Sequence, residues 1–206
     1  MKKRILTVAL VVALLATCFG GTLAYLKDSD AQTNTFTTGN VLISLDEAKV
    51  EKDEATGNLV AKKDAEGEVE RTTADQEYKL FPAMTVTKDP TITLDAGSEN
   101  AWIAAKITVS NGFDLMTHAT KTGALFDGTA NVVVDGNVLY VYVKAVQSAD
   151  AKIVLFNELN IPETWGNTEM AAINGMTINV EAYAVQANGF ATCEAAMKAA
   201  FPAAFN

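Results

Sequence analysis

The N-terminal end of the chain carries its longest apolar run. Three basic residues at positions 2–4 precede an almost uninterrupted apolar stretch from Ile5 to Phe19, and Thr22-Leu23-Ala24 follows. This order is typical of a secretory signal peptide and predicts residues 1–24 as the signal, with cleavage between Ala24 and Tyr25. Two alternatives stay open. The 22 residues from Ile5 to Leu26 are enough for an uncleaved membrane anchor, and the residues around Cys18 loosely match a lipoprotein signal.

After the signal, apolar and polar residues alternate in short stretches that predict β-strands. The first covers Thr35–Leu45. A charged segment follows, in which 16 of the 32 residues from Asp46 to Glu77 are Asp, Glu, Lys or Arg. Because so few apolar side chains are available there, we predict an acidic, exposed insert at about 48–76, either a hairpin or a mobile loop.

Regular alternation resumes at Tyr78 and predicts a mainly β fold. The Asp135-Gly136 pair predicts a type I′ hairpin turn. Two short helices are expected at Phe113–Thr120 and Phe190–Phe201. The further strands are predicted at Thr85–Lys88, Thr91–Leu94, Ala101–Ser110, Val132–Val134, Val138–Val143, Ala151–Phe156 and Met176–Val185. Short strands at this spacing indicate a single antiparallel β-sandwich domain over residues 25–206.

Charge and cysteine content restrict the function. The chain has a net charge of −9, and loss of the basic signal would make it about −12, which argues against nucleic acid or anionic lipid as a partner. Of the two cysteines, Cys18 leaves with the signal, so that Cys193 has no partner for an intrachain disulfide. We expect Cys193 to be a buried thiol on the apolar stripe of the last helix, with crosslinking between chains as the alternative.

No catalytic constellation stands out. His118 is the only histidine, and no H-E-x-x-H motif accompanies it. The serines lack a nucleophile elbow, and the turns at Asp28-Ser29-Asp30 and Asp127-Gly128 do not follow the EF-hand calcium-loop pattern. We therefore predict a non-enzymatic protein without cofactor or metal. Trp165, in a predicted loop, is the aromatic residue best placed to contact a partner, whereas core packing explains those in predicted strands: Trp102, Tyr140 and Tyr142.

Three motifs in order, G-T-L-A-Y at Gly21–Tyr25, N-T-F-T-T-G-N-V at Asn34–Val41 and A-V-Q-A-N-G-F at Ala184–Phe190, resemble the TasA/camelysin family of exported Gram-positive proteins. The resemblance runs from Lys2 to about Phe190 and includes a signal peptide of the SipW-dependent type. It implies a jelly-roll-like sandwich, processing by a dedicated signal peptidase, and a role as subunit of biofilm-matrix fibres, alone or with other matrix proteins.

In TasA-like fibres the freed N-terminal segment of one subunit is thought to complete the sheet of the next. The resemblance implies that the donor here is Tyr25–Phe36, in which we single out five residues: Tyr25, Leu26, Thr33, Thr35 and Phe36. Departures from the family pattern include Pro82-Ala83 in place of Pro-Gly and the absence of an arginine in Trp102–Lys106. They leave the fold intact, but they mean that the resemblance does not establish a specific assembly interface.

Alternatives to the fibre subunit remain. Camelysin has been classed as a metalloprotease, a role that would need His118 and carboxylates as ligands. A monomeric adhesin or ligand-binding module would use the loops around Trp165 or the acidic insert. A membrane-anchored envelope protein would keep its N-terminal apolar helix.

Overall fold

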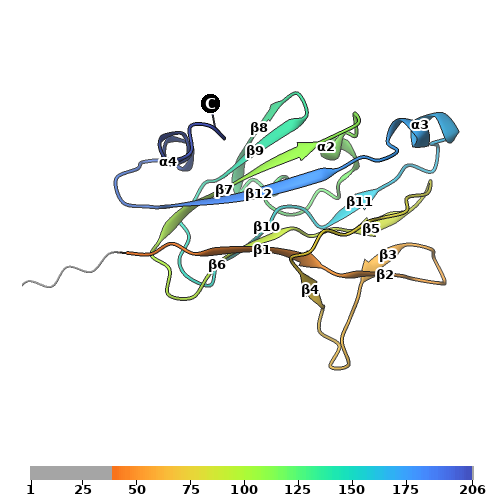
Figure 1. The fold of residues 1–206 in the computed structure, drawn as a ribbon, viewed down its shortest axis with the longest axis horizontal. Coiled ribbons are helices and arrows are strands. Elements are labelled where there is room, and N and C mark those ends of the chain that lie inside the picture. Colours follow the sequence, from red (N-terminus) through yellow and green to blue (C-terminus); the bar gives the residue numbers. More distant parts are fainter. Residues whose placement is uncertain (1–38, 206) are drawn as a thin grey trace, which may run out of the picture. The chain divides into compact units, whose positions relative to one another are not determined.

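The computed structural model describes residues 39–205, which form three four-stranded sheets in two layers (Figure 1). The upper sheet of Figure 1 has the order β12-β7-β9-β8, all antiparallel. Its strands are β12 (Ile178–Gln186), β7 (Ala101–Val109), β9 (Val138–Val143) and β8 (Ala130–Asp135). Strand β7 lies at the centre of the sheet next to β12, which is one edge, and β8 is the other edge.

The second layer consists of two sheets. One has the order β10-β6-β1-β4, with β10 (Lys152–Val154), β6 (Thr91–Leu94), β1 (Ile43–Ala48) and β4 (Arg71–Thr72). The other has the order β11-β5-β3-β2, with β11 (Glu158–Asn160), β5 (Thr85–Thr87), β3 (Leu59–Ala61) and β2 (Val50–Lys52). All pairings are antiparallel except the short contact of β3 with β5. The mainly β fold predicted from the sequence is confirmed, and its layered architecture agrees with a sandwich.

The core lies between the two layers. Alternate residues of β7, such as Ile103 and Ile107, meet Val86 of β5 and Ile92 of β6 from the opposite layer, and all four side chains are fully buried. This is the pattern expected when two sheets share one core.

A second apolar cluster covers the outer face of the upper sheet. Helix α4 (Cys193–Ala200) and Phe205 pack there on Trp102 and Tyr142. The helix begins where the Thr192 hydroxyl accepts a hydrogen bond from the Ala195 amide (3.2 Å). Strand β7 is therefore buried on both faces, and the predicted C-terminal helix with its apolar stripe is confirmed.

The other helices are short: α2 (Leu115–His118) and α3 (Asn167–Ala172). Helix α2 lies within the predicted Phe113–Thr120, whereas α3 was missed. Its N-cap is Gly166, whose amide donates to Glu169 (2.9 Å). Because α3 buries no side chain, the sequence has no apolar stripe that would predict it. No helix within residues 39–205 has the length and apolar character needed to cross a membrane.

Two sequence predictions need correction. The hairpin turn between β8 and β9 has Gly136 and Asn137 as its central residues, because Asp135 pairs with Val138. Only Gly136 has a positive φ, of 58°, which matches the φ signs of a type II′ turn and not of the predicted type I′ turn. The first described strand begins at Ile43. Leu42 is instead held by Ser98, whose hydroxyl accepts from the Leu42 amide (3.0 Å), and residues 35–38 of the predicted strand lie outside the described residues.

Backbone pairing and ion pairs hold the acidic segment at about 48–76 in place. Strands β2 and β3 form a hairpin, and β4 pairs with β1. The Arg71 guanidinium binds Asp46 (2.7 Å) and Asp89. Glu70 accepts from Lys49 (3.0 Å) and Lys62 (2.7 Å). These contacts replace the apolar burial that the segment lacks.

Candidate functional site: a pocket at the edge of the sandwich

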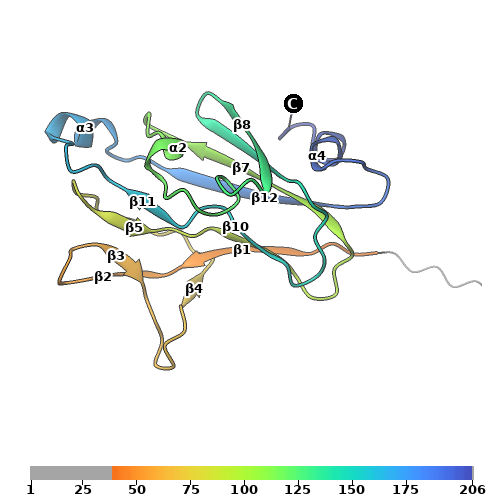
Figure 2. The same ribbon diagram turned by 180° about the vertical axis from the view of Figure 1, so that it is seen from behind.

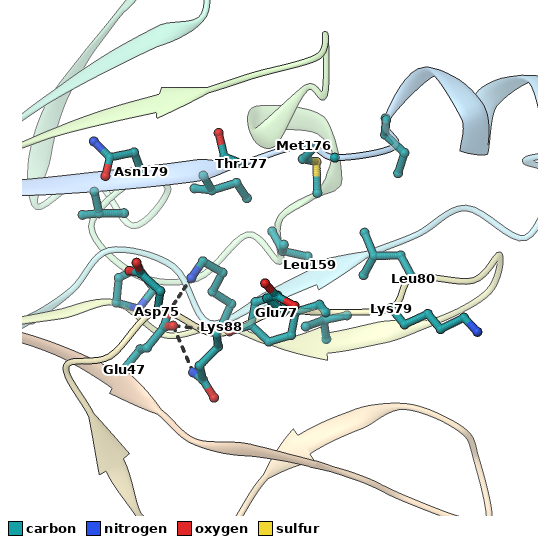
Figure 3. A pocket seen from close by; sticks show the side chains of 18 of the residues that line it. Glu47, Asp75, Glu77, Lys79, Leu80, Lys88, Leu159, Met176, Thr177 and Asn179 are labelled. Atoms are coloured by element: carbon teal, nitrogen blue, oxygen red, sulfur yellow. Dashed lines mark hydrogen bonds and ion pairs between the residues drawn. The ribbon is translucent and has the colours of Figure 1, made fainter.

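A large pocket opens between the two layers, on the side of the upper sheet where β12 is the edge (Figure 3). Its volume is about 1230 Å³. One wall is Met176–Val180, at the start of β12, and the other is residues 73–80 together with β1 and β5. We call it the edge pocket and call residues 73–80 the wall segment. A typical small-molecule pocket holds about 300–1,000 Å³, so the edge pocket is large enough for a peptide segment.

The hydrogen bonds of β12 show which of its backbone groups are free. Ser110 donates to the Thr177 carbonyl (3.0 Å) and Ala187 to the Asn100 carbonyl (2.8 Å). Because hydrogen-bonded and non-hydrogen-bonded pairs alternate in an antiparallel ladder, the odd-numbered residues of β12 bond to β7. The even-numbered residues direct their N–H and C=O groups away from β7: Ile178, Val180, Ala182, Ala184 and Gln186. The described chain places no strand against these groups.

The wall segment also has free backbone groups. Between residues 73 and 83, the single backbone–backbone hydrogen bond of the described chain is that of Met84 with the Phe81 carbonyl (3.3 Å). Side chains hold the segment instead. The Gln76 amide donates to the Ala48 carbonyl (2.9 Å) and accepts from the Val50 amide (3.2 Å). Both walls of the edge pocket therefore present backbone donors and acceptors without backbone partners.

The two most buried charges of the pocket, Lys88 and Glu47, neutralise one another, while Asp75, Glu77 and Lys79 line its exposed part. Lys88 lies 2.5 Å from the Glu47 carboxylate, and the two side chains are only 11% and 14% exposed. The Gln76 amide (2.9 Å) and the Tyr78 hydroxyl (3.3 Å) also donate to Glu47, and Lys88 lies 5.6 Å from the centre of the Tyr78 ring. Burial, followed by the charge of Glu47, raises the pKa of Tyr78, so that it stays a neutral donor.

Apolar side chains complete the lining. In Figure 3, Met176 and Leu80 extend toward the space between the walls, and Leu159 lies below Met176 and beside Leu80. Free backbone groups on both walls suit an extended peptide strand.

His118, the candidate metal ligand, lies away from such a lining. Its ring packs against Trp165 (4.9 Å between centroids) and Phe113 (5.2 Å). The nearby Asp114 caps α2 by accepting from Thr117 (3.1 Å), and the Thr117 hydroxyl lowers the pKa of Asp114. Within residues 39–205, no three His, Cys, Asp or Glu side chains are grouped so that they could hold a metal ion. The donor set does not fit a catalytic zinc site.

The remaining candidates have structural surroundings. Trp165 packs on Phe113 and His118 and belongs to the rim of the core. Cys193 is buried, and its thiol donates to the Ile103 carbonyl (3.1 Å). Burial raises the pKa of this thiol to about 12. Asp127 accepts from the Thr129 amide (2.8 Å) and hydroxyl (2.6 Å) in a solvent-exposed turn.

The predicted cleavage site at Ala24 and Tyr25 and the predicted donor residues lie outside the described residues. The donor residues are Tyr25, Leu26, Thr33, Thr35 and Phe36. The edge pocket itself was not predicted from the sequence. The one local signal is the apolar alternation of Met176–Val185, which fits a half-buried strand but does not say that the strand is an edge.

Comparison with known families gives one match. The model of a family described as camelysin metallo-endopeptidase matches residues 1–63. This confirms the resemblance to the TasA/camelysin family, over a segment that ends after β3. No curated protein and no solved structure matches the chain.

Proposed function

We propose that the protein is a structural subunit of extracellular or cell-surface fibres that assembles by strand donation into the edge pocket. The observation that carries the proposal is the free edge of β12, whose first residues, Ile178–Val180, line a pocket whose other wall also lacks backbone partners. A strand added between the two walls would satisfy both rows of backbone groups at once. The family match supports a cell-surface or extracellular protein.

The proposed donor is Tyr25–Phe36 of a neighbouring subunit, freed by cleavage after Ala24. A contact in which the N-terminal segment of each subunit enters the pocket of the next is heterologous, and such contacts produce filaments when they do not close into rings. Cleavage would control assembly, because an uncut N-terminus stays in the membrane. Signal peptidase is thus a transient partner, and secretion precedes fibre formation.

The same segment could instead fold back onto its own subunit. The two arrangements differ in the direction in which the segment would run along β12. The Glu99 amide donates to the Asn40 carbonyl (2.8 Å), while Asn100 pairs with Ala187. The described chain therefore begins beside the C-terminal end of β12, whereas the edge pocket lies at its N-terminal end. A segment returning from the pocket to Gly39 would have to run parallel to β12. A donor from another subunit can run antiparallel, the more stable arrangement.

The test is electron microscopy of the exported protein beginning at Tyr25, beside a version that begins at residue 37. We expect fibres from the first and none from the second. Equal fibres from both would overturn the donor assignment. Hydrogen exchange adds a second measurement, because the even-numbered amides of β12 should become protected only when fibres form.

A variant of the acceptor tests the other half of the contact. Ala182 is the next outward-directed residue after the pocket-lining Val180. Ala182→Pro removes an N–H that points away from β7, so it should block a strand that continues along the β12 edge from the pocket, while the ladder to β7 is kept. Ala182→Val is the matched control, because it keeps the N–H and a high strand propensity. Fibres that form normally from Ala182→Pro would exclude β12 as the acceptor.

The family description gives a second candidate, a metallo-endopeptidase. Nothing in the side-chain arrangement around His118 supports it, and we propose that the protein has no protease activity of its own. Casein hydrolysis with and without a chelator tests this, using wild type and His118→Ala. Chelator-sensitive hydrolysis that His118→Ala abolishes would establish the protease and overturn the proposal.

A further inference from the structure

The opposite edge of the upper sheet, strand β8, carries an unusual exposed apolar stretch. Figures 1 and 2 show the β8–β9 hairpin at the border of the molecule. Val133 is 48% exposed and Val134 is 56% exposed, and both belong to the small group of large hydrophobic side chains exposed within residues 39–205. Adjacent exposed valines on an edge strand are a typical site of strand pairing between chains.

Strand β8 lacks the devices that protect edge strands. Its pairing with β9 is continuous from Ala130 to Asp135, without a bulge, and it contains neither proline nor lysine. Each of the other edge strands of the described sheets has a charged residue at its first position or in its interior: Lys152 in β10, Arg71 in β4, Glu158 in β11, Glu51 in β2 and Glu181 in β12. In β8 the only charge is Asp135, the last residue. Strand β8 is therefore open to backbone pairing with a strand of another chain.

Its free backbone groups can be assigned in the same way as those of β12. The Lys144 amide donates to the Thr129 carbonyl (2.9 Å). Odd-numbered residues of β8 therefore bond to β9. Three residues direct their N–H and C=O groups away from the sheet: Ala130, Val132 and Val134. Within the described chain, no backbone or side-chain group bonds to these edges.

We propose that β8 pairs with β8 of a second copy of this chain, antiparallel, about a twofold axis at Val132. In this register Val132 faces Val132 of the second copy, and Ala130 faces Val134. All three are outward-directed residues, so each pair exchanges two backbone hydrogen bonds. The strand is complementary to itself because the small Ala130 meets the exposed Val134.

The charges agree with the same register. Asp135 faces Thr129 of the second copy, so that no two acidic residues oppose each other, although the chain has a net charge of −9. Lys144 lies beside Thr129 in the same cross-strand row. Asp135 of one copy and Lys144 of the other are then two strands apart, about 10 Å, which is beyond the screening length of about 8 Å at physiological salt, so this pair adds little attraction.

The contact uses the same patch on both copies, so it closes after two subunits. It therefore cannot build a filament. It would connect subunits of two filaments that assemble through the edge pocket on the other side of the sheet, and it is independent of the strand-donation proposal.

Sedimentation equilibrium of the exported protein carrying Ala182→Pro tests the pairing where filaments are blocked. We expect a monomer–dimer equilibrium. Adding Val134→Lys should weaken dimerisation about tenfold or more, because it places a lysine at both ends of the paired region, whereas Val134→Thr keeps size and strand propensity and should dimerise as before. A monomer at all concentrations, or a dimer that Val134→Lys leaves unchanged, would overturn the proposal.

Crosslinking tests the register. Asn131 and Val133 are exposed on the outer face, and in the proposed pair Asn131 of one copy faces Val133 of the other. Their non-hydrogen-bonded position brings the Cα atoms to about 4.5 Å, which suits a disulfide. An oxidised mixture of Asn131→Cys and Val133→Cys should give a crosslinked dimer faster than Val133→Cys alone. Equal rates would overturn the register.

These outcomes are separable from the proposed function. Dimers without fibres in the Ala182→Pro background support β8 pairing alone. Single, unbundled fibres from Val134→Lys support strand donation and agree with β8 as the lateral contact. Fibres that bundle as in wild type would show that β8 does not connect them.

Discussion

Strands β12 and β8 bound the same four-stranded sheet, but they expose their edges in different ways. The start of the β12 edge, Ile178–Val180, lines a pocket with a second wall, and most of the outward-directed residues of β12 pack their side chains into the core. The edge of β8 faces solvent, and two of its valines are about half exposed. A recessed edge can select a particular segment, whereas an exposed edge pairs most easily with an identical edge. One sheet thus offers a directional contact and a symmetric contact.

The largest expected loss of stability comes from a substitution in β7, the strand that lies between β12 and the rest of the sheet. Ile107 of β7 is fully buried between the layers, so Ile107→Ala should lower the free energy of unfolding by about 2–5 kcal/mol. Chemical denaturation measures the loss. Hydrogen exchange should accelerate in both β12 and β8, because β7 connects β12 to the rest of the sheet; acceleration in one edge alone would contradict the shared core.

Removing one partner of the pocket ion pair should affect one edge only. Lys88→Met leaves the Glu47 carboxylate nearly buried without its cation, which should cost about 3 kcal/mol. Exchange should increase along β1 and the wall segment and stay unchanged in β8. The double variant Lys88→Met/Glu47→Gln is the control and should recover part of the loss. A cost below that of a surface ion pair would show that water reaches Glu47 freely.

The outer-face cluster should respond to alkaline pH without involving either edge. Because burial raises the pKa of Cys193 to about 12 from a reference value of 9.0, the unfolded chain loses this proton first. Stability should therefore fall as the pH rises from about 9 to 12. Cys193→Ala should show a smaller fall over the same window, measured by urea unfolding at each pH. Rapid reaction of the native thiol with a disulfide reagent at pH 8 would contradict its burial.

Proline substitutions at the two edges should have the smallest effects on stability, but they should differ in their effect on fibre formation. Ala182→Pro and Val134→Pro each remove an outward N–H and no ladder hydrogen bond, so each should cost less stability than a proline whose N–H would bond within the sheet. Glu181→Pro is the control within β12, because its N–H bonds to β7 and its loss should cost clearly more. Only Ala182→Pro should abolish fibres. Loss of fibres in both edge variants would mean that the edges do not act separately.

Much of the sheet could be predicted from the sequence, since alternation and turn residues are local. The strands of the β8–β9 hairpin follow directly from the valine and tyrosine runs around Gly136. The segment of β2, β3 and β4 was predicted only as a hairpin or a mobile loop, without its individual strands, because ion pairs such as Arg71 with Asp46 stabilise it in place of apolar side chains. Composition alone cannot show that two distant charges will meet.

The edge pocket could not be predicted from the sequence either, because residues far apart in the chain form it. Glu47 and Lys88 are 41 positions apart, and neither has a neighbour that marks it as buried. The pocket exists because two layers separate at one side, which depends on the whole set of strand pairings. The identity of an edge strand is likewise a property of sheet order and not of the strand.

The outward-directed residues of β12 are its even-numbered ones, and this limits how substitutions can change the contact with an added strand. The residues whose backbone groups face a neighbour are the ones whose side chains, such as Ile178 and Val180, are committed to the core. Substitution there changes stability before it changes assembly, and most side chains leave the outward N–H and C=O untouched. The acceptor is therefore nearly indifferent to sequence drift. Discrimination between partners must come from the wall segment and from the incoming strand, which are free to diverge together.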